Sequence, residues 1–234
     1  MMMKKSKIVT LALVGLVSPT LSGLAHAENF KSGVVLSALA GASFMRTKLD
    51  ETYSAPAITS GSASNSTSDT GFMGTFSAGY RYYFSNKVLA GVEGGVTGDT
   101  AKFSKTQTVG ASGSLVTKLK APARYHAALS VGTLLSDKWL ALVKAGISFA
   151  DFKGSQQDSG LTVQKFRTHK TGLLLGAGVE RALTEKIAAV GSFTWEHFDA
   201  VKRNYNPFPG LTASNNISLK PDYYAVQAGV RISL

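Results

Sequence analysis

The carboxyl-terminal stretch, residues 223–234, alternates between apolar side chains and side chains that are mostly polar or small. The apolar positions are Tyr224, Val226, Ala228, Val230, Ile232 and Leu234. A period of two over this length predicts a β-strand with one apolar face and one polar face. Water-soluble sandwiches also contain such strands, so the pattern of the whole chain must decide the class of fold.

The same alternation recurs along the chain. The predicted strands cover residues 34–45, 72–84, 88–97, 124–132, 139–149, 172–180, 187–196 and 223–234. Short turns are predicted at residues 85–87, 136–137 and 183–186, and long polar loops at residues 47–69, 99–120, 151–165 and 199–219. Within the first loop, residues 59–68 are of low complexity and are expected to be mobile.

Strict alternation of long and short connections is typical of barrels that cross a membrane. We therefore predict an all-β fold, an eight-stranded antiparallel up-and-down transmembrane β-barrel with short periplasmic turns and four long external loops. Aromatic girdles are predicted near the periplasmic side (Tyr80, Tyr82, Phe84, Trp139) and the external side (Phe44, Phe72, Phe149, Trp195). A soluble lipocalin-like barrel is the alternative, but it would turn the apolar face inward and the charged face outward.

The amino terminus has the features of an export signal. Three lysines precede an apolar run at residues 8–17, and Ala25-His26-Ala27 forms a small-x-small cleavage site. We predict a signal peptide over residues 1–27 and a barrel domain over residues 28–234, which is 234 − 27 = 207 residues. The expected location is the outer membrane of a Gram-negative bacterium, reached through the periplasm.

Composition narrows the possible chemistry. The chain has no cysteine, which excludes disulfides, thiolate metal sites and thiol nucleophiles. It has 25 basic and 14 acidic residues, and loss of three signal-peptide lysines leaves 22 − 14 = +8. This balance favours anionic surfaces as partners. Nucleic acid is not expected, because the basic residues belong to an exported chain.

Two segments resemble the opacity-type outer-membrane β-barrel superfamily of small Gram-negative surface proteins. They are residues 84–95 (FSNKVLAGVEGG) and residues 172–182 (GLLLGAGVERA). In layout the similarity covers nearly the whole mature chain. Two features depart from the family: the last residue is Leu234 where phenylalanine is usual, and Val190 and Ser192 take inward positions where charged residues are common. We expect residues of the last strand to form the insertion signal for the barrel-assembly machinery: Tyr224, Val230, Ile232 and Leu234.

Seven charged residues fall on the predicted inward face: Arg81, Glu93, Arg124, Lys144, Glu180, Glu196 and Arg231. An eight-stranded barrel is just wide enough for side chains to fill it. Because unpaired buried charges are costly, these groups are expected to form a salt-bridged plug. The alternative is a narrow ion pathway, since glycine is common on the same face.

Basic residues also gather in the predicted external rim and loops. They are Arg46, Lys48, Lys102, Lys105, Lys118, Lys120, Lys153, Lys165, Arg167, Lys170, Lys202, Arg203 and Lys220. They are expected to lie beside outer-membrane lipid and lipopolysaccharide and to neutralise phosphates. A sharper alternative is attachment to an anionic host or matrix polymer. The barrel is expected to be a monomer with a structural envelope role and surface interaction through these loops.

Catalysis is the remaining class of function. Some small outer-membrane barrels are lipid hydrolases or acyltransferases, and a hydrolase needs a histidine placed with a serine and a carboxylate. His126, Ser130 and Glu93 could share the lumen, and His197 lies near Asp199 in sequence, but chance produces such sets in a serine-rich barrel. Haemin capture by His169, His197 or Tyr205 is a further alternative that their spacing does not require. We therefore predict no enzyme activity, no metal site and no cofactor.

Overall fold

The computed structural model of the protein describes residues 30–55, 58–84, 87–109, 113–157, 163–205 and 214–234. The predicted signal peptide, residues 1–27, lies outside these ranges. Among the described residues, no helix is long and apolar enough to cross a bilayer.

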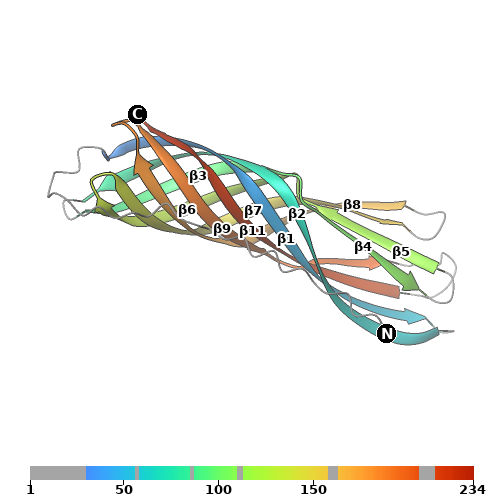
Figure 1. Ribbon diagram of the computed structural model, residues 1–234. Helices are drawn as coiled ribbons and strands as arrows, with labels where there is room; N and C mark the ends of the chain where they lie inside the picture. Colours follow the sequence, from blue (N-terminus) through green and yellow to red (C-terminus); the bar gives the residue numbers. More distant parts are fainter. Residues whose placement is uncertain (1–29, 56–57, 85–86, 110–112, 158–162, 206–213) are drawn as a thin grey trace.

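The described chain forms one antiparallel sheet that closes on itself (Figure 1). Its strands are β1 (Gly33–Ala55), β2 (Ile58–Tyr83), β3 (Val88–Asp99), β4 (Lys102–Val109), β5 (Gly113–Lys120), β6 (Ala123–Ser136), β7 (Trp139–Gln157), β8 (Val163–Ala182), β9 (Ile187–Phe198), β10 (Val201–Tyr205) and β11 (Ser214–Ser233). Short interruptions separate β3 from β4, β5 from β6, and β9 from β10, so the strands make eight barrel walls. The predicted eight-stranded barrel is confirmed.

Closure follows from the order of pairing. Around the barrel, β1, β2, β3, β6, β7, β8, β9 and β11 are each paired with the next, and β11 pairs again with β1. No edge is left open in this part of the molecule, as a strand in hydrocarbon requires. The carboxyl terminus and the short turns lie at one end, which is the periplasmic end, and the long connections lie at the other (Figure 1).

Outward and inward positions alternate as predicted. The apolar side chains of Leu36, Val92 and Val143 are on the outside, with exposed fractions of 37%, 54% and 60%. Arg81 and Glu180, which have the opposite phase, are only 3% and 1% exposed. Apolar groups therefore face the hydrocarbon and charged groups face the lumen.

The predicted loops differ from expectation, because most of their residues continue the barrel strands. The β1–β2 ladder runs without a break to Tyr53 and Gly61, and residues 59–68, which were expected to be mobile, belong to β2. Ladders between β4 and β5, β7 and β8, and β10 and β11 extend the other three hairpins in the same way. Each continued ladder satisfies backbone N–H and C=O groups that a loop would leave to water.

Beyond the membrane the extended walls separate into two sheets. The first external sheet consists of the outer parts of β2, β1 and β11 together with β10, and the second consists of β4, β5 and the outer parts of β7 and β8. Among the described residues, no ladder joins β2 to β4 or β8 to β10. Hydrogen bonds cross both seams: Lys102 N donates to Asp69 Oδ2 at 3.0 Å, and Arg203 Nη2 donates to the Arg167 carbonyl at 3.1 Å.

An apolar core fills the space between the two external sheets. Its members are Met45, Leu49, Ala101, Phe103, Leu119, Ala121, Ala150, Phe152, Phe198, Val201, Ile217, Leu219 and Tyr223, with Phe166 packed against them. The Phe152 and Phe198 rings meet edge to face at 5.3 Å, and the Phe198 and Tyr223 rings at 6.0 Å. Opposite Phe166, a Cβ atom at Gly154 would overlap the phenylalanine ring, so a larger residue at this position would force the ring to move. We call this cluster the external core.

Candidate functional site

A first layer of charged side chains crosses the lumen in its periplasmic half. Arg81 on β2 donates two hydrogen bonds of 2.8 Å to Glu180 on β8, and these two walls lie on opposite sides of the barrel. Arg231 on β11 also pairs with Glu180, and its Nε donates to Ser37 Oγ at 2.9 Å. We call this group, with the pair described next, the lower charged layer.

Glu93 and Lys144 complete the lower charged layer. The Lys144 ammonium group donates to Glu93 Oε1 at 2.9 Å, and Arg231 Nη2 lies 3.8 Å from Glu93 Oε2. The carboxylates of Glu93 and Glu180 thus lie among three cations. Side chains from β2, β3, β7, β8 and β11 are linked across the lumen.

A second layer, the upper charged layer, lies beneath the external core. Arg124 donates to Asp99 Oδ2 at 2.7 Å, and its Nε lies 2.7 Å from Glu196 Oε2. Its guanidinium also stacks on the Tyr223 ring at 4.0 Å. Ser43 Oγ donates to the second oxygen of Asp99 at 2.7 Å. Arg124 therefore connects the polar lumen to the apolar core above it.

Asp99 is the lumen residue that sequence reasoning missed. The alternation of the sequence predicted a loop from residue 99 onward and gave four inward cations but three inward carboxylates. With Asp99 the carboxylates become Glu93, Asp99, Glu180 and Glu196, so four negative charges match the four cations. The alternation of the strand could have indicated its inward position, because Asp99 lies two residues after the inward-facing Thr97.

Neutral polar side chains lie between the two charged layers. Thr75 and Thr97 share a hydrogen bond of 3.0 Å, and Gln227 Nε2 donates to Thr75 Oγ1 at 2.8 Å. These bonds join β3, β2 and β11 across the inner face of the barrel.

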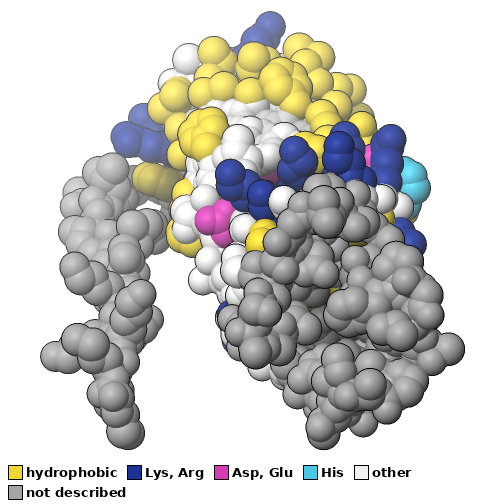
Figure 2. Space-filling model, turned by 90° about the vertical axis from the view of Figure 1, so that its right-hand side faces the viewer, with side chains coloured by type: hydrophobic (Ala, Val, Ile, Leu, Met, Phe, Trp, Pro, Cys, Tyr) yellow, Lys and Arg dark blue, Asp and Glu magenta, His cyan; other side chains and the backbone are white. Residues whose placement is uncertain are grey.

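The predicted external cations divide between the two external sheets. On the outer surface of the first are Arg46, Lys48, Lys202 and Lys220. On the outer surface of the second are Lys102, Lys118, Lys120, Lys153, Lys165 and Arg167. Lys105 and Lys170 have the inward phase and are half-buried, and Arg203 lies over the Phe166 ring at 5.2 Å. Figure 2 looks onto this end of the barrel and shows Lys and Arg side chains gathered there, next to hydrophobic outer surface.

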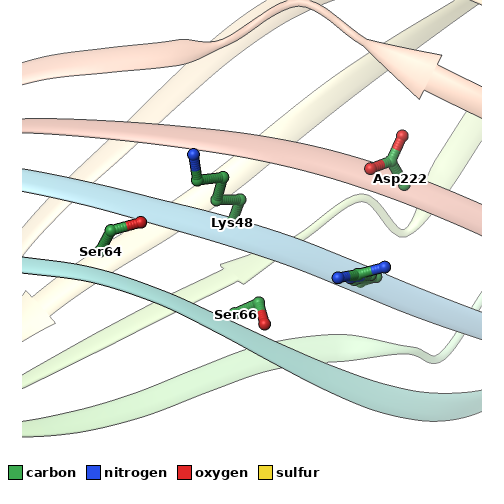
Figure 3. Close-up of a pocket in the computed structure, with 5 residues that line it drawn as sticks. Lys48, Ser64, Ser66 and Asp222 are labelled. Carbon is green, nitrogen blue, oxygen red and sulfur yellow. The ribbon is translucent and has the colours of Figure 1, made fainter.

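One carboxylate, that of Asp50, lies between two lysines of the first external sheet. Asp50 Oδ1 lies 3.4 Å from the Lys48 ammonium group and Oδ2 lies 3.5 Å from that of Lys220. A hydrogen bond from Ser64 to Asp50, supported by the two lysines, lowers the pKa of this carboxyl below its usual value. A shallow cavity of about 370 Å³ lies here, lined by Ser64 and Ser66 from β2, Arg46 and Lys48 from β1, and Asp222 from β11 (Figure 3).

A second shallow cavity, of about 510 Å³, lies at the seam between β8 and β10. It is lined by Thr168, Lys170, Asp199, Ala200, Lys202 and Arg203. The lining mixes three cations with one carboxylate, and the cavity is open to solvent.

Comparison with known proteins identifies the family. The sequence matches the outer membrane protein beta-barrel domain over residues 11–231. The chain belongs to this family. The match agrees with the opacity-type resemblance, and it places the protein in the outer membrane of Gram-negative bacteria.

The fold of this chain is similar to solved structures of small outer-membrane barrels. OprG from Pseudomonas aeruginosa has a TM-score of 0.51 and 13% identity, over 88% of this chain and 99% of OprG. Ail of Yersinia pestis, in complex with the heparin analogue sucrose octasulfate, has a TM-score of 0.41 and 12% identity, over 87% of this chain and 100% of Ail. Neisserial surface protein A has a TM-score of 0.38 and 17% identity, over 84% of this chain and 99% of that protein. At these identities the likeness to OprG concerns the fold alone. No curated protein is significantly similar in sequence.

The histidines of this outer-membrane barrel do not form the hydrolase set that the sequence suggested. Glu93 is bound to Lys144, and no hydrogen bond joins it to His126 or joins His126 to Ser130 among the described residues. His197 Nδ1 lies 2.7 Å from Asp222 Oδ1, so its carboxylate partner is not Asp199. His169 lies 3.7 Å from Asp151, and the side chain of Tyr205 is outside the described part of the chain. No group of three or more metal-binding side chains occurs among the described residues.

The residues expected to form the insertion signal lie on β11 and, for Leu234, directly after it. Tyr224, Val230 and Ile232 have the outward phase of that strand, next to β1. The backbone N–H of Leu234 donates to the Val34 carbonyl at 3.0 Å, which holds the end of the chain against the first strand. The last strand therefore offers a continuous apolar outer face at the site of barrel closure.

Proposed function

We propose that this protein is a closed outer-membrane barrel with a structural role in the envelope and surface interaction through its basic external sheets. The observation that carries the proposal is the filling of the interior. The lower charged layer, the upper charged layer and the external core follow one another along the lumen. Solute passage would have to break buried ion pairs, which is costly.

The outer surface supports the second half of the proposal. Ten exposed cations lie on the outer surfaces of the two external sheets, four on the first and six on the second. Extended ladders hold them on rigid strands rather than on loose loops. Rigid scaffolds with exposed charged residues suit recognition of anionic surfaces. The partners that fit are lipopolysaccharide phosphates and anionic host or matrix polymers.

Export and assembly complete the proposal. Cleavage before Glu28 would leave 207 residues (234 − 27). Intact-mass measurement of the protein extracted from the membrane tests this cleavage site. Recognition of Tyr224, Val230, Ile232 and Leu234 by the barrel-assembly machinery and a monomeric state remain part of the same proposal.

Deleting the β4–β5 hairpin tests this function. We expect a barrel in which a short Gly-Ser linker replaces residues 102–120 to remain folded, because the transmembrane ladders do not include this hairpin. Cells carrying it should become more sensitive to detergents or lose salt-sensitive adhesion to sulfated glycans. The matched control is Ser104→Ala with Thr106→Ala, which changes the outer surface of β4 without changing its charge.

Heat-modifiable migration on gels verifies folding in each case. Detergent sensitivity alone would support the envelope role, and loss of adhesion alone would support surface attachment. A folded deletion variant with normal envelope resistance and normal adhesion contradicts the proposal.

A further inference from the structure

Four cations on the second external sheet lie in one cross-strand row. Lys102 on β4 is opposite Lys120 on β5, Lys120 is opposite Lys153 on β7, and Lys153 is opposite Arg167 on β8. All four side chains are exposed on the outer surface. With neighbouring strands about 4.8 Å apart, the row extends roughly 15 Å around the barrel. We call it the cationic row.

The cationic row carries an energetic cost in the isolated protein. Like charges directly opposite one another on adjacent strands destabilise a sheet, and this row contains three such pairs in succession. Lys118 and Lys165 add two cations in the next outward-facing row. The ammonium groups of Lys102, Lys120 and Lys153 lie within ion-pair distance of no described carboxylate, and Asp151 pairs with Arg167. A bound anion would offset this repulsion.

The first external sheet offers a comparison, because a carboxylate lies between two of its opposed lysines. Lys48 and Lys220 are directly opposite each other, as Lys120 and Lys153 are. There, however, Asp50 lies 3.4 Å and 3.5 Å from the two ammonium groups. The absence of a described carboxylate between Lys120 and Lys153 is therefore specific to the second external sheet.

The height of the cationic row above the hydrocarbon and the direction of its side chains determine which anions it can contact. Lys153 lies two outward positions beyond Phe149, an exposed aromatic residue of the external girdle. Those four residues of tilted strand raise it by about 10 Å, which corresponds to the headgroup layer beside the hydrocarbon or just above it. Its side chain points sideways, toward the surrounding leaflet, rather than away from the membrane. Phosphate groups of outer-leaflet lipopolysaccharide lie at this level.

We propose that the cationic row is a binding site for lipopolysaccharide phosphates, an inference that rests on the surface role proposed above. The three lysines act as point charges, and Arg167 adds a planar guanidinium that binds phosphate through two hydrogen bonds. Asp151 accepts a hydrogen bond from Arg167, which orients the guanidinium.

Binding of purified lipopolysaccharide to the folded, detergent-solubilised protein tests the proposal. Lys120→Gln with Lys153→Gln should weaken binding about 25-fold, at roughly fivefold for each cation near an anionic surface. The same pair should slightly raise the unfolding temperature without lipopolysaccharide, because it removes repulsion. The matched control, Lys138→Gln with Lys186→Gln, removes the same charge from the short turns at the periplasmic end and should change binding less than about twofold.

Three ligands separate the possible anions. Intact lipopolysaccharide should bind, and chemically dephosphorylated lipopolysaccharide should bind much more weakly. Dextran sulfate should compete poorly. Equal losses in the two lysine pairs, equal binding of the dephosphorylated lipid, or tighter binding of dextran sulfate would each overturn the site. If the lipopolysaccharide-binding test fails but deletion of the β4–β5 hairpin impairs envelope resistance or adhesion, the proposed surface role still stands. If both tests fail, the surface role is contradicted as well.

Discussion

Replacing Glu180 with alanine is expected to destabilise the barrel by about 3–5 kcal/mol, the usual cost of removing one partner from a buried ion pair. Glu180 accepts two hydrogen bonds of 2.8 Å from Arg81 and also pairs with Arg231. Its loss leaves two buried guanidinium groups with only Glu93 nearby. Urea unfolding in detergent micelles, followed by heat-modifiable gel migration, measures the change in free energy of unfolding.

Two comparisons make the Glu180 result specific. Glu185→Ala removes an exposed carboxylate that pairs with Lys31 at 3.1 Å, and it should change stability very little. Glu180→Ala combined with Arg231→Ala should cost less than the sum of the two single changes, because the double variant leaves fewer unpaired charges. If Glu180→Ala unfolds at the same urea concentration as Glu185→Ala, the lower charged layer does not stabilise the barrel.

Replacing Phe152 with alanine is expected to loosen the external sheets while leaving the transmembrane barrel folded. Phe152 is completely buried in the external core and contacts the Phe198 ring edge to face. Truncating a buried phenylalanine typically costs about 3–5 kcal/mol. Because the lipid-embedded ladders do not contain residue 152, the loss should appear as local opening of the hairpins.

Limited proteolysis of the folded protein measures that opening. Phe152→Ala should be cleaved in its external hairpins many times faster than the wild type, with heat-modifiable migration retained. Phe149→Ala is the matched control, since it truncates an outward-facing phenylalanine three residues away on the same strand. Equal cleavage rates in Phe152→Ala and wild type would show that the external core does not hold the two sheets together.

The transmembrane half of the fold follows directly from the sequence. Apolar residues at every second position can face hydrocarbon only from a closed strand barrel, so the eight segments and their phase could be assigned before the structure. The same phase placed Arg81, Glu180 and Arg231 inward. Phase also limits the prediction, because it says which face a residue occupies but not which residues meet across the lumen.

The external hairpins could not be predicted in the same way. In residues 59–68, serine, threonine and glycine replace the apolar residues, so the alternation disappears although the backbone stays in β2. Pairing with β1 and a core assembled from distant segments hold these strands, and tertiary context overrides weak local propensity. Met45, Phe103 and Ile217 gave no local signal of a common core.

The register between strands determines which of the predicted site residues lie next to one another, and the sequence alone does not give that register. Lys102 and Lys120 could be counted among rim cations, but their alignment with Lys153 and Arg167 depends on the relative shift of four strands. A shift by one residue would turn a side chain to the other face of the sheet. Asp99 was missed for a related reason. The strand β3 continues to Asp99, which keeps the inward orientation, whereas the prediction ended the strand at residue 97 and assigned Asp99 to a loop.

Single-channel recording in planar bilayers tests the closed lumen most directly. The wild-type barrel should show no steady conductance, because two ion-paired layers and the external core occupy its interior. The Glu180→Ala and Phe152→Ala double variant, with both obstructions weakened, should show at least intermittent openings under the same conditions. Steady and reproducible conductance of nanosiemens scale in the wild-type protein would contradict the closed barrel.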